Sequence, residues 1–366
     1  MEKKKKILLY GPSAGQAIKS YGGGTGGYVR NMTVYKNHFQ SDFFLQIPCY
    51  HSVRGEFRFK NFALRLIYDV FIFVKALLQN NPKGVHILGR YRPAIVREFM
   101  VVLVARFFRV TVLYDLKAGH FIKWYKSTHF LFRWMAKFCL TKSKIVLSEG
   151  IPNIDFLKKE LGINVFYFPN FVPDAEVSAT PRNLFSNPKL SVLFVGYCIK
   201  EKGIFELVEA CNLAAKEIPI SLTIVGQEHP DFTEWMEKMN FEKEFTIKRL
   251  GKQPHSKVIE QFTKNDIYCY PTSYQGEGHN NTINEAMMME MIIVTTRHGF
   301  LDSILSEDRA YFMNQIQASE IAQIFQKINE NRPLAKQKAR KAKQHLMENF
   351  LSSIAFEKLE KYYQKL

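Results

Sequence analysis

Hydrophobic and polar residues follow two patterns, which alternate along the chain. Short apolar runs bounded by glycine, proline or asparagine predict buried strands, and the longer stretches between them repeat apolar residues every three or four positions, as helices do. In the first half, helical patterns cover residues 62–79 and 94–106. The strands expected there are residues 6–10, 84–88, 110–114, 144–147 and 165–168.

A second series of the same kind begins after a stretch rich in proline and asparagine. Its helical patterns cover residues 204–216, 255–264 and 282–289. The strands expected there are residues 191–195, 221–225, 246–250, 266–270 and 291–295. Strands that alternate with helices favour parallel sheets, so the sequence predicts an α/β protein of two doubly wound halves, with a ligand in the cleft at the carboxyl ends of the strands.

The domain boundaries follow from this pattern. We expect a first Rossmann-like domain over residues 1–172, a linker over 173–188 and a second domain over 189–345. The remaining segment begins as a strongly basic helix and ends as an amphipathic one. Its last part, about residues 346–366, is expected to pack back on the first domain.

Composition narrows the class of protein. The chain has 366 residues, of which 46% are hydrophobic and 23% charged, which fits two globular domains and not a disordered or fibrous chain. The most apolar stretches are interrupted by charges before the ~20 residues that a membrane span needs. The apolar run at residues 7–10 is too short for an export signal, so we expect a cytoplasmic protein. Five widely spaced cysteines predict neither a disulfide framework nor a zinc site.

The net charge of +17 is unevenly distributed. Residues 54–144 contain 18 lysines and arginines against 4 acidic residues, interleaved with aromatic residues. Such faces suit an anionic membrane surface, although each segment alone could be a core helix with a lysine-rich outer side. A nucleic-acid-binding protein is a further alternative that rests on the charge only.

The most informative stretch is residues 277–287, where a loop rich in glycine and asparagine enters a helix. Backbone N–H groups at such a helix start favour an anion, and a diphosphate fits. Glu277 and Glu285 would flank this anion and accept hydrogen bonds from sugar hydroxyls and from a ribose diol. Alternatively, Thr282 and Glu285 form a capping box, in which the glutamate only satisfies a backbone donor.

This stretch resembles glycosyltransferase family 4, the retaining transferases of GT-B fold, whose motif of two glutamates separated by seven residues is matched by Glu277 and Glu285. The variant is similar to the form found in bacterial surface-polysaccharide transferases. Supporting elements follow in the family's order, among them Gly196 after a strand and Lys202 before a helix. The glycine loop at residues 22–27, with Gly24 and Gly26, resembles the family's early glycine loop.

The resemblance implies two Rossmann-like domains, a nucleotide-diphosphate sugar as donor and retention of configuration. Lys202 would bind the donor diphosphate as a point charge. The family usually has an arginine after the strand glycine, and this chain has Tyr197 there. The other donor-binding residues that the resemblance implies are Gly196, Tyr197, Asn281, Thr282, Ile283, Glu285, Gly24 and Gly26.

In the first domain the family often has a histidine and an aspartate after a central strand, with the histidine near the transferred sugar. Here tyrosine stands where the histidine would fall, so Asp115 and His120 are the catalytic candidates beside Glu277. The chain contains no Asp-x-Asp, and we expect no metal and no cofactor. The helix start and Lys202 would then neutralise the leaving diphosphate.

The sequence therefore predicts a metal-independent hexosyltransferase of cell-surface polysaccharide synthesis, acting in O-antigen or capsule formation. Its acceptor would be a glycan, possibly carried on a polyprenyl diphosphate, and the enzyme would be peripheral on the inner face of the cell membrane. An epimerase or a phosphorylase on the same architecture is the alternative within enzymes. Binding of nucleic acid is not expected.

Overall fold

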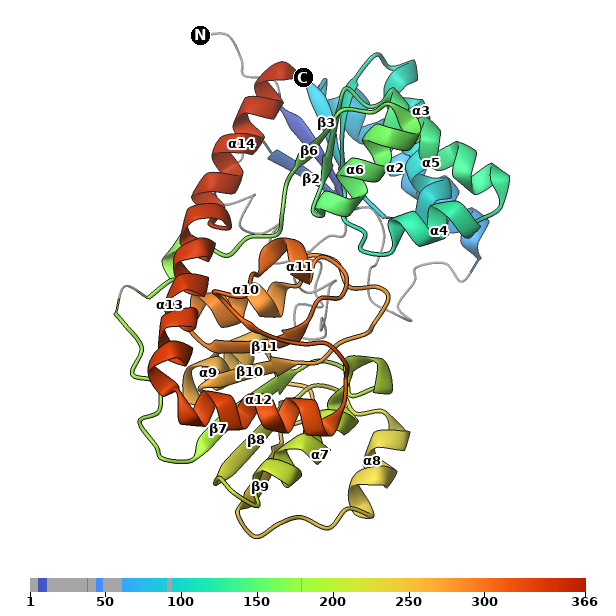
Figure 1. The fold of residues 1–366 in the computed structure, drawn as a ribbon. Helices are drawn as coiled ribbons and strands as arrows, with labels where there is room; N and C mark the ends of the chain where they lie inside the picture. The colour runs from blue at the N-terminus through green and yellow to red at the C-terminus, as the bar shows by residue number, and fades with distance from the viewer. Residues whose placement is uncertain (1–5, 12–37, 39–43, 49–60, 91–93, 179) are drawn as a thin grey trace. The chain divides into compact units, whose positions relative to one another are not determined.

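A computed structural model describes residues 6–11, 38, 44–48, 61–90, 94–178 and 180–366, and these form two compact units (Figure 1). The N-terminal unit comprises Met1–Asn170 and Ser352–Leu366, and the C-terminal unit comprises Phe171–Leu351. Each unit contains one six-stranded sheet in which all paired strands are parallel. The prediction of two Rossmann-like α/β domains is confirmed. The expected glycine loop with Gly24 and Gly26 lies outside the described residues.

The sheet of the N-terminal unit has the strand order β2-β1-β3-β4-β5-β6. The five expected strands are present within about two residues of their predicted ends, and β2, which the pattern did not indicate, adds an edge. The strands are β1 (Ile7–Gly11), β2 (Phe44–Pro48), β3 (Gly84–Gly89), β4 (Thr111–Leu116), β5 (Ile145–Ser148) and β6 (Val165–Tyr167).

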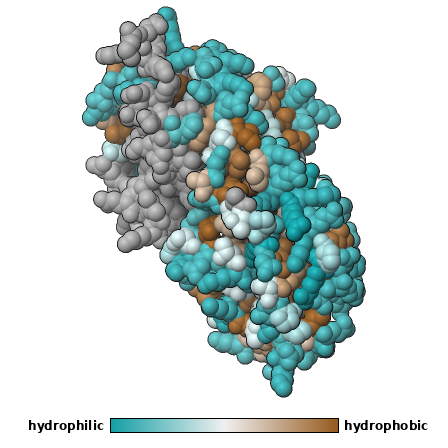
Figure 2. Space-filling model, turned by 90° about the vertical axis from the view of Figure 1, so that its left-hand side faces the viewer, coloured by the Kyte–Doolittle hydropathy of each residue, from teal (hydrophilic) through white to brown (hydrophobic). Residues whose placement is uncertain are grey.

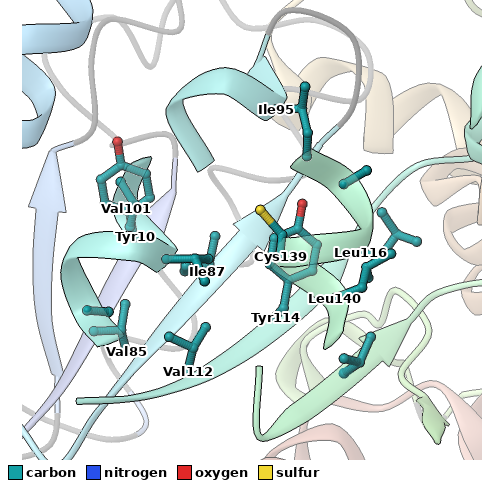
Figure 3. Packing of buried hydrophobic residues seen from close by; sticks show 14 of the residues in the cluster. Tyr10, Val85, Ile87, Ile95, Val101, Val112, Tyr114, Leu116, Cys139 and Leu140 are labelled. Atoms are coloured by element: carbon teal, nitrogen blue, oxygen red, sulfur yellow. The ribbon is translucent and has the colours of Figure 1, made fainter. Parts of the chain in front are cut away.

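Side chains that alternate along these strands fill two cores, because successive strand residues point to opposite faces. On one face Tyr10, Ile87 and Tyr114 pack with buried residues of the helices, as the cluster in Figure 3 shows. The helices of this unit are α2 (Phe62–Asn80), α3 (Ala94–Phe107), α4 (Phe121–Ser127), α5 (Phe130–Lys142), α6 (Ile151–Leu161) and α14 (Ser352–Lys365).

Helix α14 supplies the contacts of the other face. The Tyr363 hydroxyl lies 2.7 Å from Nδ1 of His86, and both residues are buried. Tyr362 packs against Phe166 with ring centroids 5.2 Å apart, and the Lys83 ammonium donates to the carbonyl oxygens of Tyr363 and Gln364. Strands from the beginning of the chain and a helix from its last residues therefore share one core.

The sheet of the C-terminal unit has the strand order β12-β11-β10-β7-β8-β9. Chain order therefore reverses between β7 and β10, and in doubly wound folds ligands bind at the carboxyl ends of strands at such a switch point. The strands are β7 (Leu190–Val195), β8 (Ile220–Val225), β9 (Phe245–Arg249), β10 (Ile267–Tyr270), β11 (Ile292–Thr296) and β12 (Tyr311–Met313).

The helices of this unit cover both faces of its sheet (Figure 1). Helices α7 and α12 pack together, and α10 packs with α9 and α13. The helices are α7 (Ile204–Ala214), α8 (Pro230–Glu237), α9 (His255–Lys264), α10 (Asn281–Met288), α11 (Leu301–Ile304), α12 (Ala318–Glu330) and α13 (Arg332–Asn349). The short 3₁₀-helices η2 (Asp174–Glu176) and η3 (Lys200–Lys202) precede β7 and α7.

The surface seen in Figure 2 carries hydrophobic residues in small groups between hydrophilic ones. In the described part of the chain, no helix combines the length and the apolar composition that crossing a membrane requires.

The hydrogen bond between Tyr363 and His86 provides a test of how α14 is held. Replacing Tyr363 by Phe leaves buried His86 without this partner, and we expect the free energy of unfolding to fall by about 1–3 kcal/mol. Tyr362→Phe is the matched control, because the Tyr362 hydroxyl makes no hydrogen bond within the described residues. Urea denaturation of both variants checks this, and equal stabilities would contradict it.

Candidate functional site

The site predicted around residues 196–203 and 277–285 lies at the switch point of the C-terminal sheet. Gly196 follows β7, and the chain then forms η3, which carries Lys202. Gly203 adopts a φ of +65° and lies so close to the end of β10 that a Cβ there would overlap the carbonyl oxygen of Pro271. The backbone N–H of Ser273 donates to the carbonyl of Glu201 at 2.8 Å. Glycine at 203 thus allows η3 to lie against the end of β10.

This packing brings Lys202 to Glu277, 75 positions further along the chain. The Lys202 ammonium donates to Oε1 of Glu277 and to the hydroxyl of Tyr270, the last residue of β10. The Tyr270 hydroxyl in turn donates to Oε1 of Glu277 at 3.0 Å. The ammonium also lies 4.5 Å from the ring centroid of Tyr274. The side chains of Lys202 and Glu277 are 12% and 6% exposed, so the ion pair is largely desolvated.

Tyr270 stays a hydrogen-bond donor in this cluster. Burial raises the pKa of Tyr270 well above its ordinary value, and the neighbouring Glu277 carboxylate raises it further. The hydroxyl is therefore protonated at neutral pH and orients the carboxylate of Glu277.

The second oxygen of Glu277 connects the cluster to the start of α10. Oε2 accepts a hydrogen bond from the Asn280 side-chain amide at 2.8 Å. Asn280 is the N-cap of α10, and its Oδ1 accepts from the Thr282 backbone N–H at 2.8 Å and from the Thr282 hydroxyl at 2.7 Å. The N-terminal end of α10 is therefore fixed beside Glu277.

These contacts correct the capping-box alternative. That alternative needs Thr282 as the N-cap and its backbone N–H bonded to Glu285, but Asn280 holds that N–H and Thr282 lies inside the helix. Glu285 is buried, and its Oε1 lies 2.9 Å from Nε2 of His255. The residue therefore has a side-chain partner from the start of α9. The error arose because asparagine and threonine are both good N-caps.

The other donor-site candidates line the same strand ends. Asn281 and Thr282 are partly exposed in the first turn of α10, and Ile283 is buried behind them. Gly196 lies against Gly226, which has a φ of +153° and where a Cβ would overlap the Gly196 carbonyl. Tyr197 is 41% exposed, with its ring centroid 6.2 Å from that of His229. Within the described ranges, no group of three or more His, Cys, Asp or Glu side chains is placed to hold a metal ion.

The first-domain candidates lie in different surroundings. Asp115, near the end of β4, is fully buried, 3.7 Å from Nε2 of His86 and 3.6 Å from the ammonium of Lys117. His120 is partly exposed at the N-cap position of α4 and makes no capping bond. Asp115 is thus a buried neighbour of His86 and Lys117 inside the N-terminal unit. The catalytic roles of Asp115 and His120 stay predictions.

Sequence reasoning missed three residues that complete the site: Tyr270, Asn280 and His255. Tyr270 ends a buried strand at the switch point, and Asn280 stands two residues before the helical pattern that begins at residue 282, so both positions carried a signal. No sequence signal marked His255, because its contact with Glu285 exists only once the fold brings α9 beside α10.

Solved structures share this fold. Two parallel-sheet units of this kind define the GT-B fold, and the structure of sucrose-phosphate synthase from Thermosynechococcus elongatus matches with a TM-score of 0.75 at 14% identity, covering 99% of both chains. HepE from Anabaena, solved in complex with UDP-glucose, matches with a TM-score of 0.72 at 14% identity, covering 99% of this chain and 100% of that one.

Residues 178–345, within the C-terminal unit, match the family described as glycosyl transferases group 1, and this part of the chain is similar to that family. The capsular polysaccharide biosynthesis glycosyltransferase CapM of Staphylococcus aureus is 22% identical over 254 residues, which cover 64% of this chain and 64% of CapM. The chain thus spans slightly less than two thirds of that relative's length.

The close approach at Gly203 can be tested against a second glycine of similar conformation. Gly251 has a φ of +62° with nothing within 4 Å of an added Cβ. We expect Gly251→Ala to cost roughly 1–2 kcal/mol through backbone strain alone. Gly203→Ala should cost about 1–3 kcal/mol more, because the Cβ displaces Pro271 and η3. Thermal and urea unfolding compare the two variants, and equal losses would show that the contact with β10 is not tight.

Proposed function

We propose that the chain is a retaining glycosyltransferase that moves a sugar from a nucleotide-diphosphate donor to a glycan acceptor. The observation that carries this proposal is the Lys202–Glu277–Tyr270 cluster at the switch point of the C-terminal sheet, beside the start of α10. The family match of residues 178–345 supports it, and retention of configuration rests on the resemblance to the retaining transferases.

Lys202 is suited to the donor diphosphate. An ammonium group has three donors, and the structure uses two of them, for Glu277 and Tyr270. The third is left for a phosphate oxygen. At the start of α10 the Asn280 side chain holds the Thr282 N–H, and the N–H groups of Asn281 and Ile283 remain for an anion. These groups would neutralise charge that develops on the leaving diphosphate.

Glu277 and Glu285 are suited to the polyol parts of the donor. A carboxylate offers about four acceptor sites, and Glu277 uses three of them in the described residues, for Lys202, Tyr270 and Asn280. One site is left for a sugar hydroxyl. Glu285 lies 2.9 Å from Nε2 of His255 through Oε1, and we propose that its carboxylate accepts from the ribose diol. Gly196 and Tyr197, at the end of β7, would lie against the nucleotide. The donor-binding roles of Gly24 and Gly26 stay predictions of the sequence.

The N-terminal unit would present the acceptor. We propose that this acceptor is a glycan on a lipid carrier and that the enzyme works at an anionic membrane surface on the cytoplasmic side, in synthesis of capsule or O-antigen. The printed role of CapM in capsular polysaccharide biosynthesis and the basic, aromatic-rich residues 54–144 support this. Asp115 and His120 are the candidates from this unit for a role near the transferred sugar.

The first test concerns the charge on Lys202. Lys202→Met removes a preorganised cation, and we expect kcat/KM for sugar transfer to fall by about 10²–10³. Lys200→Met is the matched control from the same 3₁₀-helix, because Lys200 is exposed and has no ion-pair partner within the described residues. Steady-state kinetics with the cognate donor measure both. Equal activities of the two variants would exclude Lys202 as the diphosphate ligand.

The second test concerns Glu285. Glu285→Gln keeps the size of the side chain but weakens its acceptor strength, so donor affinity should fall about tenfold while the fold is kept. The donor is first found by thermal shift with UDP, GDP and ADP sugars, since a ligand at 100 times its Kd adds about 2.7 kcal/mol. Isothermal titration then compares Glu285→Gln with Glu244→Gln, an exposed glutamate of the same unit. Unchanged affinity in Glu285→Gln would assign Glu285 to structure alone.

A further inference from the structure

The N-terminal unit has a basic pocket that the donor site does not use. Its volume is about 420 Å³, and it lies where α3 and α5 end and β4 and β5 begin. Four cationic residues line it, together with the hydroxyl residues Thr111, Thr141 and Ser143. The cationic residues are Arg106, Arg109, Lys142 and Lys144. The pocket is at the amino ends of the strands, whereas Asp115 lies near the carboxyl end of β4.

Among the residues that the structure describes, the four cations have no acidic partner. No acidic residue lines the pocket, and within the described residues none of the four takes part in an ion pair. The acids described between residues 61 and 144 are Asp69, Glu98 and Asp115, and all three are buried. The described residues 61–144 therefore supply no exposed carboxylate side chain to neutralise the pocket, although Leu366, the last residue, accepts a hydrogen bond from the Thr111 hydroxyl at 3.2 Å.

Favourable interaction with the negative ends of helix dipoles explains two of these four cations and not the others. Arg106 and Lys142 lie in the last turns of α3 and α5, where a cation stabilises the helix end. Arg109 and Lys144 lie beyond the helices, at the entries to β4 and β5, and Arg109 has a φ of +57°, unusual for a residue other than glycine. Four cations around one cavity indicate an anionic ligand with several oxygen atoms.

Hydrophobic side chains are exposed at the same edge. Helices α2, α3 and α5 pack side by side, and each leads within a few residues into the start of β3, β4 or β5, which are neighbours in the sheet. Phe107, next to Arg106, is 82% exposed, and Leu103, one turn earlier, and Leu78, near the end of α2, are 42% and 65% exposed. Cations beside exposed apolar side chains are typical of surfaces that bind the membrane interface.

We propose that this pocket binds the phosphate-bearing headgroup of an anionic phospholipid, with Phe107 and its apolar neighbours entering the edge of the acyl region. The inference rests on the proposed function in one respect, that the acceptor is carried on a lipid. The pocket holds the N-terminal unit on the bilayer and takes no part in binding the nucleotide sugar.

The test uses the full chain and vesicles of phosphatidylglycerol mixed with phosphatidylcholine, with binding measured by co-sedimentation. The double variant Lys142→Gln and Lys144→Gln should bind roughly 30-fold more weakly, since each near-surface cation contributes a factor of about five. The matched control is Lys243→Gln with Lys248→Gln, two exposed lysines of the C-terminal unit without ion-pair partners in the described residues. Equal losses in both double variants would show general electrostatic attraction and overturn the proposal.

A second arm distinguishes a lipid headgroup from free phosphate. Phe107→Ser should lower binding to the vesicles and leave binding of inorganic phosphate, measured by titration, as in the wild type. If Phe107→Ser kept full vesicle binding, the lipid assignment would be wrong.

Sugar transfer to a water-soluble acceptor analogue is measured in parallel. We expect it to stay at the wild-type rate in all these variants, because none touches the donor site. A wild-type chain that transfers sugar but does not bind the vesicles would refute the pocket and the membrane location, while the proposed sugar transfer stood. A chain that binds the vesicles without transferring sugar would refute the proposed sugar transfer and leave the pocket standing.

Discussion

The arrangement of the C-terminal site depends on one buried ion pair, between Lys202 and Glu277. Removing both charges from water is costly, and such a pair persists only when further hydrogen bonds satisfy its remaining donors and acceptors. Tyr270 and Asn280 supply these bonds, so the pair ties together η3, the end of β10 and the start of α10. Buried ion pairs add little stability on average, and their cost is better explained where they place charges for a ligand.

Close approach of backbone segments makes the pair possible. Gly203 lies against Pro271, Gly226 against Gly196, and Gly299 against Glu277, and in each case an added Cβ would overlap backbone atoms. The three contacts surround the carboxyl ends of β7, β8 and β10. A side chain at Gly203 would move η3, which carries Lys202, away from the end of β10, and one at Gly299 would displace Glu277. These two glycines therefore help to set the distance between the two charges.

Much of the fold could be predicted from the sequence, because both sheets are built from continuous apolar runs with clear ends. β10 was expected at residues 266–270 and spans Ile267–Tyr270. β2 was missed because its short sequence, which includes Gln46 and Pro48, lacks such a run. For the site, the pattern of a loop entering a helix indicated both glutamates, and the family resemblance indicated Lys202. It could not reveal which partners they have, because the contacts of Lys202 with Glu277 and of His255 with Glu285 join distant segments.

The basic character of the N-terminal unit is stronger in the fold than in the sequence. Two of its few acids are buried carboxyls: burial raises the pKa of Asp69 to about 7, against the effect of Arg97, and burial raises the pKa of Glu98 to about 7 although Tyr114 donates to it. A raised pKa means that each is about half protonated near neutral pH and supplies only part of a negative charge. The three acids described between residues 61 and 144 are buried, so they offset little of the positive charge that this segment exposes. Other acids of the N-terminal unit are exposed, among them Asp155, Glu160 and Glu357, and Glu357 pairs with Lys361 on the surface. The positive charge left for a partner outside the chain is therefore that of residues 61–144.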